Sequence, residues 1–449
     1  MSQTIGFFPL LNKVQKHISE KYSASLSEKD KYGQLKSYID QYLHEKEYEV
    51  EGLNFKELSD KLYSEMAEYS ILTKYLNRKD IEEININGWD DIAITYTDGH
   101  IEKTKEHFYS PQHSVDIVKR LLHHSGMLID NMIPIAQGHL PNNTRIAALK
   151  TPIVDDDRGI SVSIRLLHPA RVTKEEIVKE NGATQKMIDF LCMCLRYGVS
   201  FVIAGATSSG KTTTLNSLLS TIPDNKRIFT IESGSRELSL IRKKDDVITN
   251  NVVHTLSKPS ENESADISQE DLVVASLRFN PDIIVVGEMR DTEAYAAVEA
   301  SLTGHTVVST IHASAGESSH TRLALLCQKR FPIDFETSIR QVAQAFPLVI
   351  YAHKLEDNSR KIMDISECVI SPSGEREYHS LFRYNIKSNR LNGNEYIIDG
   401  YYEQPEIMSE QLKSRLMQYG VPQTELNKFL QKGADYVWFY QSYLLCSLL

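Results

Sequence analysis

The chain has 449 residues, of which 41% are hydrophobic and 24% are charged, and its formal net charge at pH 7 is −10. This length and this ordinary composition predict a folded protein of two or three domains, and exclude a largely disordered or fibrous one. The acidic balance argues against a large nucleic-acid footprint, because binding to a phosphate backbone depends on Lys and Arg.

No segment of the sequence is expected to span a membrane. The longest apolar runs, at 201–206 and 346–352, are far shorter than the roughly 20 residues that cross a bilayer. The first residues show neither the cationic start nor the long apolar stretch of a signal peptide. Five scattered cysteines without zinc-site spacing are typical of reduced thiols. We therefore expect a cytoplasmic protein.

The first part of the chain has apolar residues at helical spacing. Leu35 and Ile39 form one such pair, and Leu58 and Leu62 form another, within an otherwise polar stretch. We predict a helical N-terminal appendage over residues 1–75.

Residues 76–166 have the texture of a compact α/β domain. Turn signals at Asn87-Gly88 and Asp98-Gly99 separate short runs that are rich in β-branched residues. The predicted strands lie at 84–87, 92–96 and 160–165. One helix, from about Ser114 to His124, is expected between them, so this stretch is predicted to fold as a small N-terminal domain.

The next part of the chain alternates apolar strands with helical stretches. Thr173 and Glu176 form a capping box, so residues 167–175 are predicted to be a linker that enters a helix. The alternation over 176–355 is the signature of a parallel sheet covered by helices. Its strands are expected at 200–204, 227–231, 282–286 and 306–310. Residues 356–449 are predicted to form a C-terminal region of mixed structure that ends in helices.

A glycine-rich loop, GATSSGKT, carries the clearest chemical signal and lies between an apolar strand and a helical run. Its backbone N–H groups and the following helix start can hold phosphate oxygens. Lys211 would reach the β and γ phosphates of a nucleotide, and the Thr212 hydroxyl would ligate Mg²⁺. The predicted nucleotide contacts are Gly205, Ala206, Thr207, Ser208, Ser209, Gly210, Lys211, Thr212 and Thr213.

Such a loop needs a carboxylate at the end of another strand, to handle the metal and the attacking water. Glu288 follows an apolar strand at the edge where ligands bind in open α/β sheets, and we predict that it orients and deprotonates water. An aspartate commonly precedes this glutamate, but Gly287 stands there. Direct help for the metal is therefore assigned to Glu232, with Glu237 as the alternative.

Two histidines, His305 and His312, flank the apolar run 306–311. A spacing of seven would point their rings to opposite faces of a straight strand, so a joint metal site is not expected. Spacing alone leaves open a structural role and a phosphate-sensing role.

In combination these segments resemble the secretion-ATPase superfamily, which powers type II and type IV secretion, conjugation and type IV pili. Residues 205–212 resemble its Walker A motif, and 230–238 its acidic "Asp box". Residues 277–290 resemble its Walker B motif, in which glycine precedes glutamate, and 304–312 resemble its "His box". The resemblance covers roughly residues 78–435.

The resemblance implies a RecA-like ATPase domain preceded by a smaller, PAS-like α/β domain. Such proteins form homohexamers that bind ATP between the two domains and use Mg²⁺. Their N-terminal arginines approach the phosphates, and the best-matched positions here are Arg145 and Arg165. The resemblance also assigns His305 and His312 a link to the γ-phosphate or a conformational role. The predicted catalytic set is completed by Lys211, Glu232 and Glu288.

The implied function is a motor on the inner face of the cytoplasmic membrane that acts on a polytopic inner-membrane platform protein. Its own membrane association would be peripheral. Similarity at 381–384 and 419–422 favours the tight-adherence (Tad) pilus and conjugation-type branch. Two alternatives stay open: a type IV secretion or conjugation ATPase that transfers DNA or effectors, and a nucleotide-dependent scaffold with little turnover. A hexameric helicase is disfavoured by the acidic charge.

Overall fold

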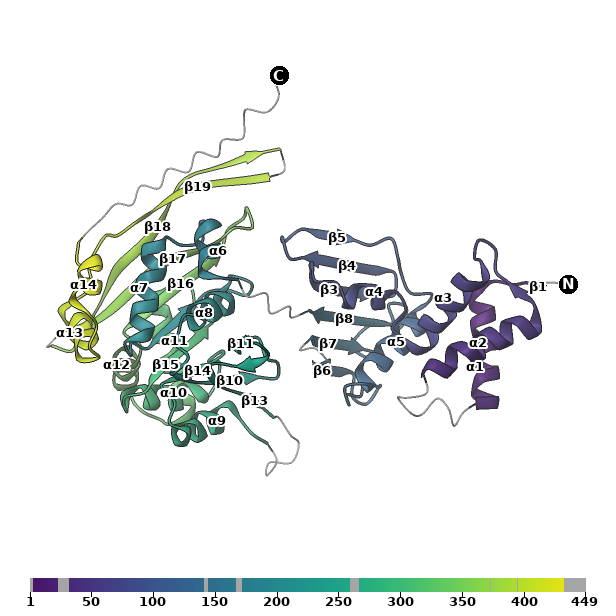
Figure 1. The fold of residues 1–449 in the computed structure, drawn as a ribbon, viewed down its shortest axis with the longest axis horizontal. Coiled ribbons are helices and arrows are strands. Elements are labelled where there is room, and N and C mark those ends of the chain that lie inside the picture. Colours follow the sequence, from purple (N-terminus) through teal and green to yellow (C-terminus); the bar gives the residue numbers. More distant parts are fainter. Residues whose placement is uncertain are drawn as a thin grey trace, which may run out of the picture. The chain divides into compact units, whose positions relative to one another are not determined.

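The computed structural model describes residues 3–22, 32–140, 144–166, 172–258, 266–371, 373–393 and 395–431. It divides into two compact units, 1–168 and 169–449 (Figure 1). Most of the predicted linker, and the part of the predicted C-terminal region beyond residue 431, lie outside the described residues.

Three helices fill the start of the first unit: α1 (Phe7–Tyr22), α2 (Tyr32–Lys46) and α3 (Phe55–Ala67). Leu10, Ile39, Leu58 and Leu62 lie buried at their common core. Two short strands, β1 (Gln3–Thr4) and β2 (Tyr48–Glu49), pair in parallel beside them. The spacing noted in the sequence therefore corresponds to a helical core.

The rest of the first unit is a six-stranded sheet in the order β5-β4-β3-β8-β7-β6, in which all pairs are antiparallel. Its strands are β3 (Ile81–Gly88), β4 (Asp91–Tyr96), β5 (Ile101–Lys103), β6 (Ile135–His139), β7 (Arg145–Lys150) and β8 (Ile160–Arg165). Two short helical turns, η3 (Ser70–Leu72) and α4 (Thr73–Leu76), precede the sheet, and α5 (Pro111–His123) packs on it. The strands expected at 84–87, 92–96 and 160–165 are confirmed.

Helices α1 and α3 make specific contacts with α5 and with Tyr109 just before it. The Phe8 ring stacks on Tyr109 with centroids 3.6 Å apart. Glu65 Oε2 lies 2.9 Å from His113 Nε2, and Arg120 Nη1 donates to the Glu65 carbonyl at 2.9 Å. These helices and the sheet therefore belong to one compact unit.

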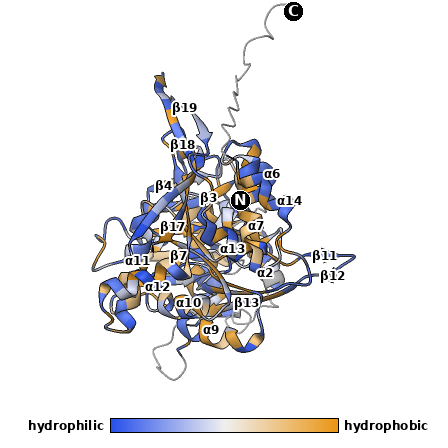
Figure 2. Ribbon diagram, turned by 90° about the vertical axis from the view of Figure 1, so that its left-hand side faces the viewer, coloured by the Kyte–Doolittle hydropathy of each residue, from blue (hydrophilic) through white to orange (hydrophobic). Residues whose placement is uncertain are grey.

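The second unit contains a nine-stranded sheet, and the expected parallel core is confirmed. Neighbouring strands from β13 through to β16 run parallel, whereas β17, β18 and β19 add antiparallel neighbours. In sheet order the strands are β13 (Asn251–Ser257), β10 (Arg227–Ser233), β14 (Ile283–Val286), β15 (Thr306–Ile311), β9 (Phe201–Ala204), β16 (Leu348–Lys354), β17 (Arg360–Ile370), β18 (Arg376–Asn392) and β19 (Glu395–Glu403). A separate antiparallel ribbon pairs β11 (Lys243–Lys244) with the apolar β12 (Val247–Ile248), and the charged residues of β11 and of the turn are blue in Figure 2.

Helices cover both faces of this sheet, as parallel strands require. One face carries α6 (Lys174–Lys179), α7 (Gln185–Arg196), α8 (Lys211–Leu219), α13 (Glu410–Gln418), α14 (Gln423–Leu426) and η6 (Asn427–Phe429). The other carries α9 (Gln269–Ser276), η5 (Leu277–Phe279), α10 (Glu293–Leu302), α11 (Gly316–Arg330) and α12 (Phe335–Ala345). Within β9, Phe201 and Ile203 join the first core, and Val202 and Ala204 join the second. The central strand is thus buried on both faces.

The predicted capping box at the start of α6 is confirmed. Thr173 Oγ1 accepts from the Glu176 N–H, and the Glu176 carboxylate accepts from the Thr173 N–H.

The predicted boundary at residue 355, between the ATPase domain and the C-terminal region, falls between β16 and β17, which pair within one sheet. Residues 360–403 thus extend the sheet that begins with β9. Within the ranges that the structure describes, no helix is long and apolar enough to cross a bilayer.

A buried histidine gives the second unit an expected pH dependence of stability. His320, on α11, is fully buried; Nε2 donates to the Phe346 carbonyl at 2.9 Å, and Nδ1 lies 2.9 Å from the Tyr378 hydroxyl. Burial lowers the pKa of His320 to about 4. Because the unfolded chain takes up this proton first, stability is full above about pH 6.5 and falls as the pH drops towards 4.

We expect this group to remove about 2 kcal/mol of unfolding free energy between about pH 7.5 and pH 5. Urea unfolding across that range, followed for the full chain and for His320→Gln, measures the effect. The variant should be less stable at pH 7.5 but less sensitive to pH. His254, whose pKa burial also lowers to about 4, contributes in both proteins. Equal pH dependence in the two proteins would rule out His320 as the cause.

Candidate active site

The glycine-rich loop joins the central strand β9 to the N-terminus of α8, so the predicted strand, loop and helix are all present. Gly210 occupies the N-cap position with φ 90°, and Ser208 has φ 62°. Backbone N–H groups at this helix start have no partner within the helix, which makes the start favourable for an anion. The loop lies at the carboxyl edge of the parallel strands, where ligands bind in such sheets.

The loop lysine is folded back onto the loop itself. Lys211 Nζ donates to the carbonyls of Gly205 at 3.0 Å and Ala206 at 2.7 Å. The side chain is almost fully buried, so its charge is held inside the space that the loop encloses. Thr212, in the first turn of α8, is half-buried, and Thr213 is exposed.

Gly287 and Glu232 are neighbours at the same edge of the sheet. The parallel pairing of Ile231 with Val286 places Glu232 beside Gly287. A Cβ added at Gly287 would lie 3.2 Å from Glu232 Cγ and 3.4 Å from the Ile231 carbonyl. The glycine that precedes Glu288 therefore leaves the space in which the Glu232 side chain lies.

The Glu232 carboxylate is buried with one oxygen satisfied and one not. Oε1 accepts from the N–H groups of Glu237 at 2.7 Å and Leu238 at 2.9 Å. Oε2 is buried and has no hydrogen-bond partner among the described residues. Burial raises the pKa of Glu232 to about 7, although the two backbone N–H groups act in the opposite direction. A buried carboxylate with an unsatisfied oxygen fits a hard cation such as Mg²⁺.

The second predicted metal ligand, Thr212, starts from a different part of this edge. Two strands, β14 and β15, lie between β9 and β10. The strand that leads to Thr212 and the strand that carries Glu232 are therefore about 14 Å apart across the sheet.

Glu288 and His312 are brought together. Glu288 follows β14, His312 follows β15, and Glu288 Oε1 lies 3.3 Å from His312 Nε2. Both side chains are partly open to solvent. Thr310 fixes this corner, because its hydroxyl donates to the Gly287 carbonyl at 2.7 Å and its carbonyl accepts from Met289 N at 2.9 Å.

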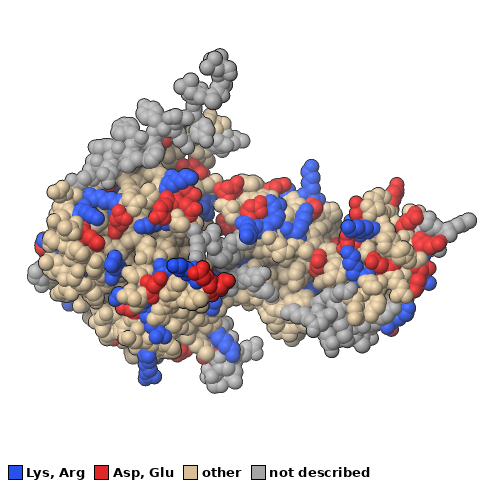
Figure 3. All heavy atoms as spheres, viewed as in Figure 1, with Lys and Arg blue, Asp and Glu red and all other residues tan. Residues whose placement is uncertain are grey.

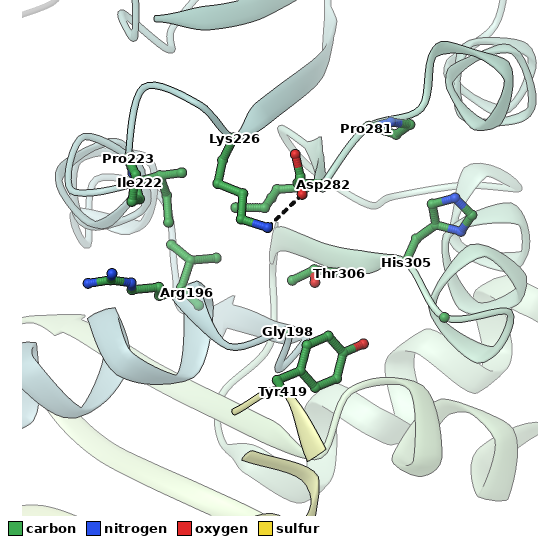
Figure 4. Close-up of a pocket in the computed structure, with 13 residues that line it drawn as sticks. Arg196, Gly198, Ile222, Pro223, Lys226, Pro281, Asp282, His305, Thr306 and Tyr419 are labelled. Atoms are coloured by element: carbon green, nitrogen blue, oxygen red, sulfur yellow. Dashed lines mark hydrogen bonds and ion pairs between the residues drawn. The ribbon is translucent and has the colours of Figure 1, made fainter. Parts of the chain in front are cut away.

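His305 is not brought to this edge. It precedes β15, whereas His312 follows it, and a strand of this length separates the two by about 20 Å. His305 lines a separate cavity of about 280 Å³ at the amino edge of the sheet. The same cavity is lined by the ion pair of Lys226 and Asp282, whose Nζ and Oδ1 are 2.7 Å apart, and Figure 4 shows the His305 ring pointing away from that pair. Within this unit, His305 is therefore remote from the glycine-rich loop, residues 205–212, hereafter the phosphate loop.

The two predicted arginines lie in the first unit, side by side. Arg145 on β7 and Arg165 on β8 are directly opposite in the antiparallel register, so their side chains share one face of the sheet. Arg165 Nη2 lies 3.7 Å from Glu82 Oε1. Their part in nucleotide chemistry stays a prediction.

One residue at the loop was missed by the sequence analysis. Arg360, the first residue of β17, donates from Nε to the Ser208 carbonyl at 3.0 Å. It belongs to no motif and lies in the stretch that was assigned to a C-terminal region. The only signal that could have found it is the pairing of β17 with β16, which periodicity does not reveal.

A parallel sheet with a glycine-rich loop between its central strand and a helix N-terminus, and with carboxylates on neighbouring strand ends, defines a phosphate-binding α/β protein. The chain belongs to the family described as type II/IV secretion system proteins, whose profile matches residues 65–386.

Curated relatives come from both archaea and bacteria. An uncharacterised protein of Methanocaldococcus jannaschii, MJ0900, is 33% identical over 44% of this chain and 34% of its own length. The type IV secretion system protein PtlH of Bordetella pertussis is 38% identical over 31% of this chain and 40% of its own length. The competence protein ComGA of Halalkalibacterium halodurans is 33% identical over 42% and 49%. The chain thus matches less than half the length of each of these relatives.

Solved structures of similar proteins include two ATPases. The ATPase DotB of Legionella pneumophila has a TM-score of 0.47 and 20% identity, over 79% of this chain and 83% of that one. The VirB11 ATPase of the Brucella suis type IV secretion system has a TM-score of 0.35 and 22% identity, over 66% and 95%.

Proposed function

We propose that this chain hydrolyses ATP with Mg²⁺ and, as a homohexamer, drives a secretion or type IV (Tad-like) pilus machine from the cytoplasmic side of the inner membrane. One observation carries the enzymatic part. Glu288, paired with His312, and the buried Glu232 lie at the same carboxyl edge as the phosphate loop. The family supports the assignment to a secretion or pilus machine.

In this proposal the loop residues 205–213 bind the phosphates through backbone N–H groups. Lys211 leaves the two carbonyls that it contacts and pairs with the β and γ phosphates. Thr212 would hold Mg²⁺ directly, and Glu232, on a strand about 14 Å away, would act on the ion through the water ligands that Mg²⁺ usually keeps. The ion would neutralise charge on the phosphate oxygens when it is bound.

Glu288 is the group that acts on water. It orients a water molecule in line with the γ phosphorus and takes up its proton. His312, at 3.3 Å, keeps the carboxylate directed towards the phosphate edge. Arg145 and Arg165 are proposed to spread positive charge over the phosphates in the transition state, because guanidinium groups carry fixed charge. A conformational role is proposed for His305.

The proposed partner is a polytopic inner-membrane platform protein, to which the ring binds peripherally. The relatives named for secretion and competence support a machine of this kind. On the face shown in Figure 3, the coloured Lys and Arg residues are interspersed with Asp and Glu. That mixed surface does not favour a track for a nucleic-acid backbone.

A second candidate is a type IV secretion or conjugation ATPase, which the identity with PtlH favours. The two candidates share the ATP chemistry and differ in cargo. Pilin and pilin-peptidase genes beside the coding sequence would support the pilus motor, and relaxase and coupling-protein genes would support conjugation.

Steady-state phosphate release with ATP and Mg²⁺, combined with light scattering with and without nucleotide, tests the proposal. We expect the full chain to form a hexamer and to turn over. A chain that binds ATP but shows neither assembly nor turnover, even with membranes that contain its platform protein, would favour a nucleotide-dependent scaffold.

A further inference from the structure

The turn between β16 and β17 lies against the phosphate loop. β16 runs parallel to β9, so its carboxyl end reaches the same edge of the sheet as the loop. β17 returns antiparallel, with Arg360 opposite Lys354. The chain therefore brings Arg360 to the loop from a segment 152 positions after Ser208.

The Arg360 side chain lies along the loop. Its Nε donates to the Ser208 carbonyl at 3.0 Å. Its Cδ lies 3.3 Å from the position that a Cβ on Gly210 would take. The side chain thus contacts the loop just before the helix N-terminus that would receive a phosphate.

The peptide between Ser208 and Ser209 has a strained conformation, and its orientation sets the direction of a backbone N–H in the loop. Ser208 has φ 62°, a left-handed conformation that costs a non-glycine residue about 1 kcal/mol or more. The Ser208 carbonyl and the Ser209 N–H belong to one planar trans peptide and point in opposite directions. Fixing the carbonyl on Arg360 therefore also fixes the direction of the Ser209 N–H, whose bond to the Ala206 carbonyl is long at 3.4 Å.

Sheet order separates Arg360 from the proposed chemical groups. Glu232, Glu288 and His312 lie on or directly after β10, β14 and β15, all to one side of β9. Arg360 lies on the other side of β9, because β17, which carries it, is separated from β9 by β16. A residue in this place can set the shape of the loop without touching the attacking water.

We propose that Arg360 is a positioning residue that holds the phosphate loop in its nucleotide-binding conformation. The inference rests on the proposed nucleotide site and adds a determinant of affinity from outside the sequence motifs. It makes the affinity for phosphates, rather than the rate of the chemical step, depend on the β16–β17 turn.

Binding of ATP, ADP and inorganic tripolyphosphate to the full chain, measured by calorimetry, tests the role of Arg360. We expect Arg360→Ala to raise the dissociation constants of all three ligands about ten-fold. A loss of this size corresponds to one charge-assisted hydrogen bond at a partly open site. KM for ATP should rise by a similar factor, with kcat within about two-fold of wild type. Arg360→Lys keeps the charge but lacks Nε, and should fall in between.

Arg390→Ala is the matched control. Arg390 lies on β18 of the same sheet, is largely exposed, and has Asp399 as its ion-pair partner at 3.4 Å. It should bind all three ligands as wild type does. Thermal unfolding of each variant shows whether a loss of binding reflects a loss of fold.

Wild-type affinity in Arg360→Ala would overturn the inference. A decrease in kcat alone would also overturn it, because Arg360 would then act in the chemical step. A loss of affinity for ATP but not for tripolyphosphate would overturn it too, because Arg360 would then contact the nucleoside. Failure of the wild type to bind any of the three ligands would instead remove the proposed function itself.

Discussion

Replacement of Glu288 by glutamine is expected to lower kcat for ATP hydrolysis at least about 100-fold while ATP still binds. Glutamine keeps the size of the side chain and can stay near His312, which lies 3.3 Å from Glu288 in the wild type. Its amide is unable to take up a proton from water, so only the chemical step is lost. Single-turnover phosphate release at saturating ATP, together with calorimetric binding, measures the two effects separately.

Asp291→Asn is the control for this experiment. Asp291 lies three residues further along, is exposed, and pairs with Lys329 Nζ at 2.9 Å. The variant removes the same charge from the neighbourhood and should keep near wild-type turnover. If Glu288→Gln retained more than about a tenth of wild-type kcat, Glu288 would not be the general base.

Glu232→Gln is expected to lower kcat by about 100-fold and to raise the Mg²⁺ concentration that half-maximal activity requires. Glutamine Oε1 can still accept from the Glu237 and Leu238 N–H groups, so the turn that Glu232 supports is kept. An amide NH₂ would replace the unsatisfied Oε2 and oppose a cation. Activity as a function of Mg²⁺ concentration, with thermal unfolding as a check on the fold, makes the measurement.

Glu237→Gln separates the two acids of this segment. If Glu237 handles the metal, its variant will shift the Mg²⁺ requirement and Glu232→Gln will leave it unchanged. If Glu232 is only a support for the turn, neither variant will alter the Mg²⁺ requirement.

The parts of the site that could be predicted from the sequence are those in which one short segment carries both the chemistry and its support. The strand, loop and helix around residues 201–219 form such a segment, and the structure reproduces it. Glu232 and Glu288 each end an apolar run, which predicts a carboxyl edge. The two acids are close because β10 and β14 pair in a register that places Glu232 beside Gly287, the residue before Glu288. The order of the motifs in the sequence suggests this pairing but does not determine it.

What could not be predicted depends on which strands pair. The periodicity of apolar residues indicates which face of a strand is buried. It does not indicate which other strand pairs with it, because that depends on the arrangement of the whole sheet. β17 therefore looked like the start of another region, although its first residue contacts Ser208. His305 and His312 are a different case: their spacing already argued against a joint site, only the family resemblance gave them a shared role, and the structure places the full length of β15 between them.

The position of β9 in the middle of its sheet has a consequence for synthesis. Both of its neighbours are made much later, since Val202 pairs with Ser309 on one side and with Val349 on the other. An incomplete chain that ends before residue 348 has one edge of this apolar strand without a partner, and such edges can pair with other chains. The parallel core around the glycine-rich loop is therefore complete only after residue 354 has been made, and until then the free edge of β9 is open to pairing with other chains.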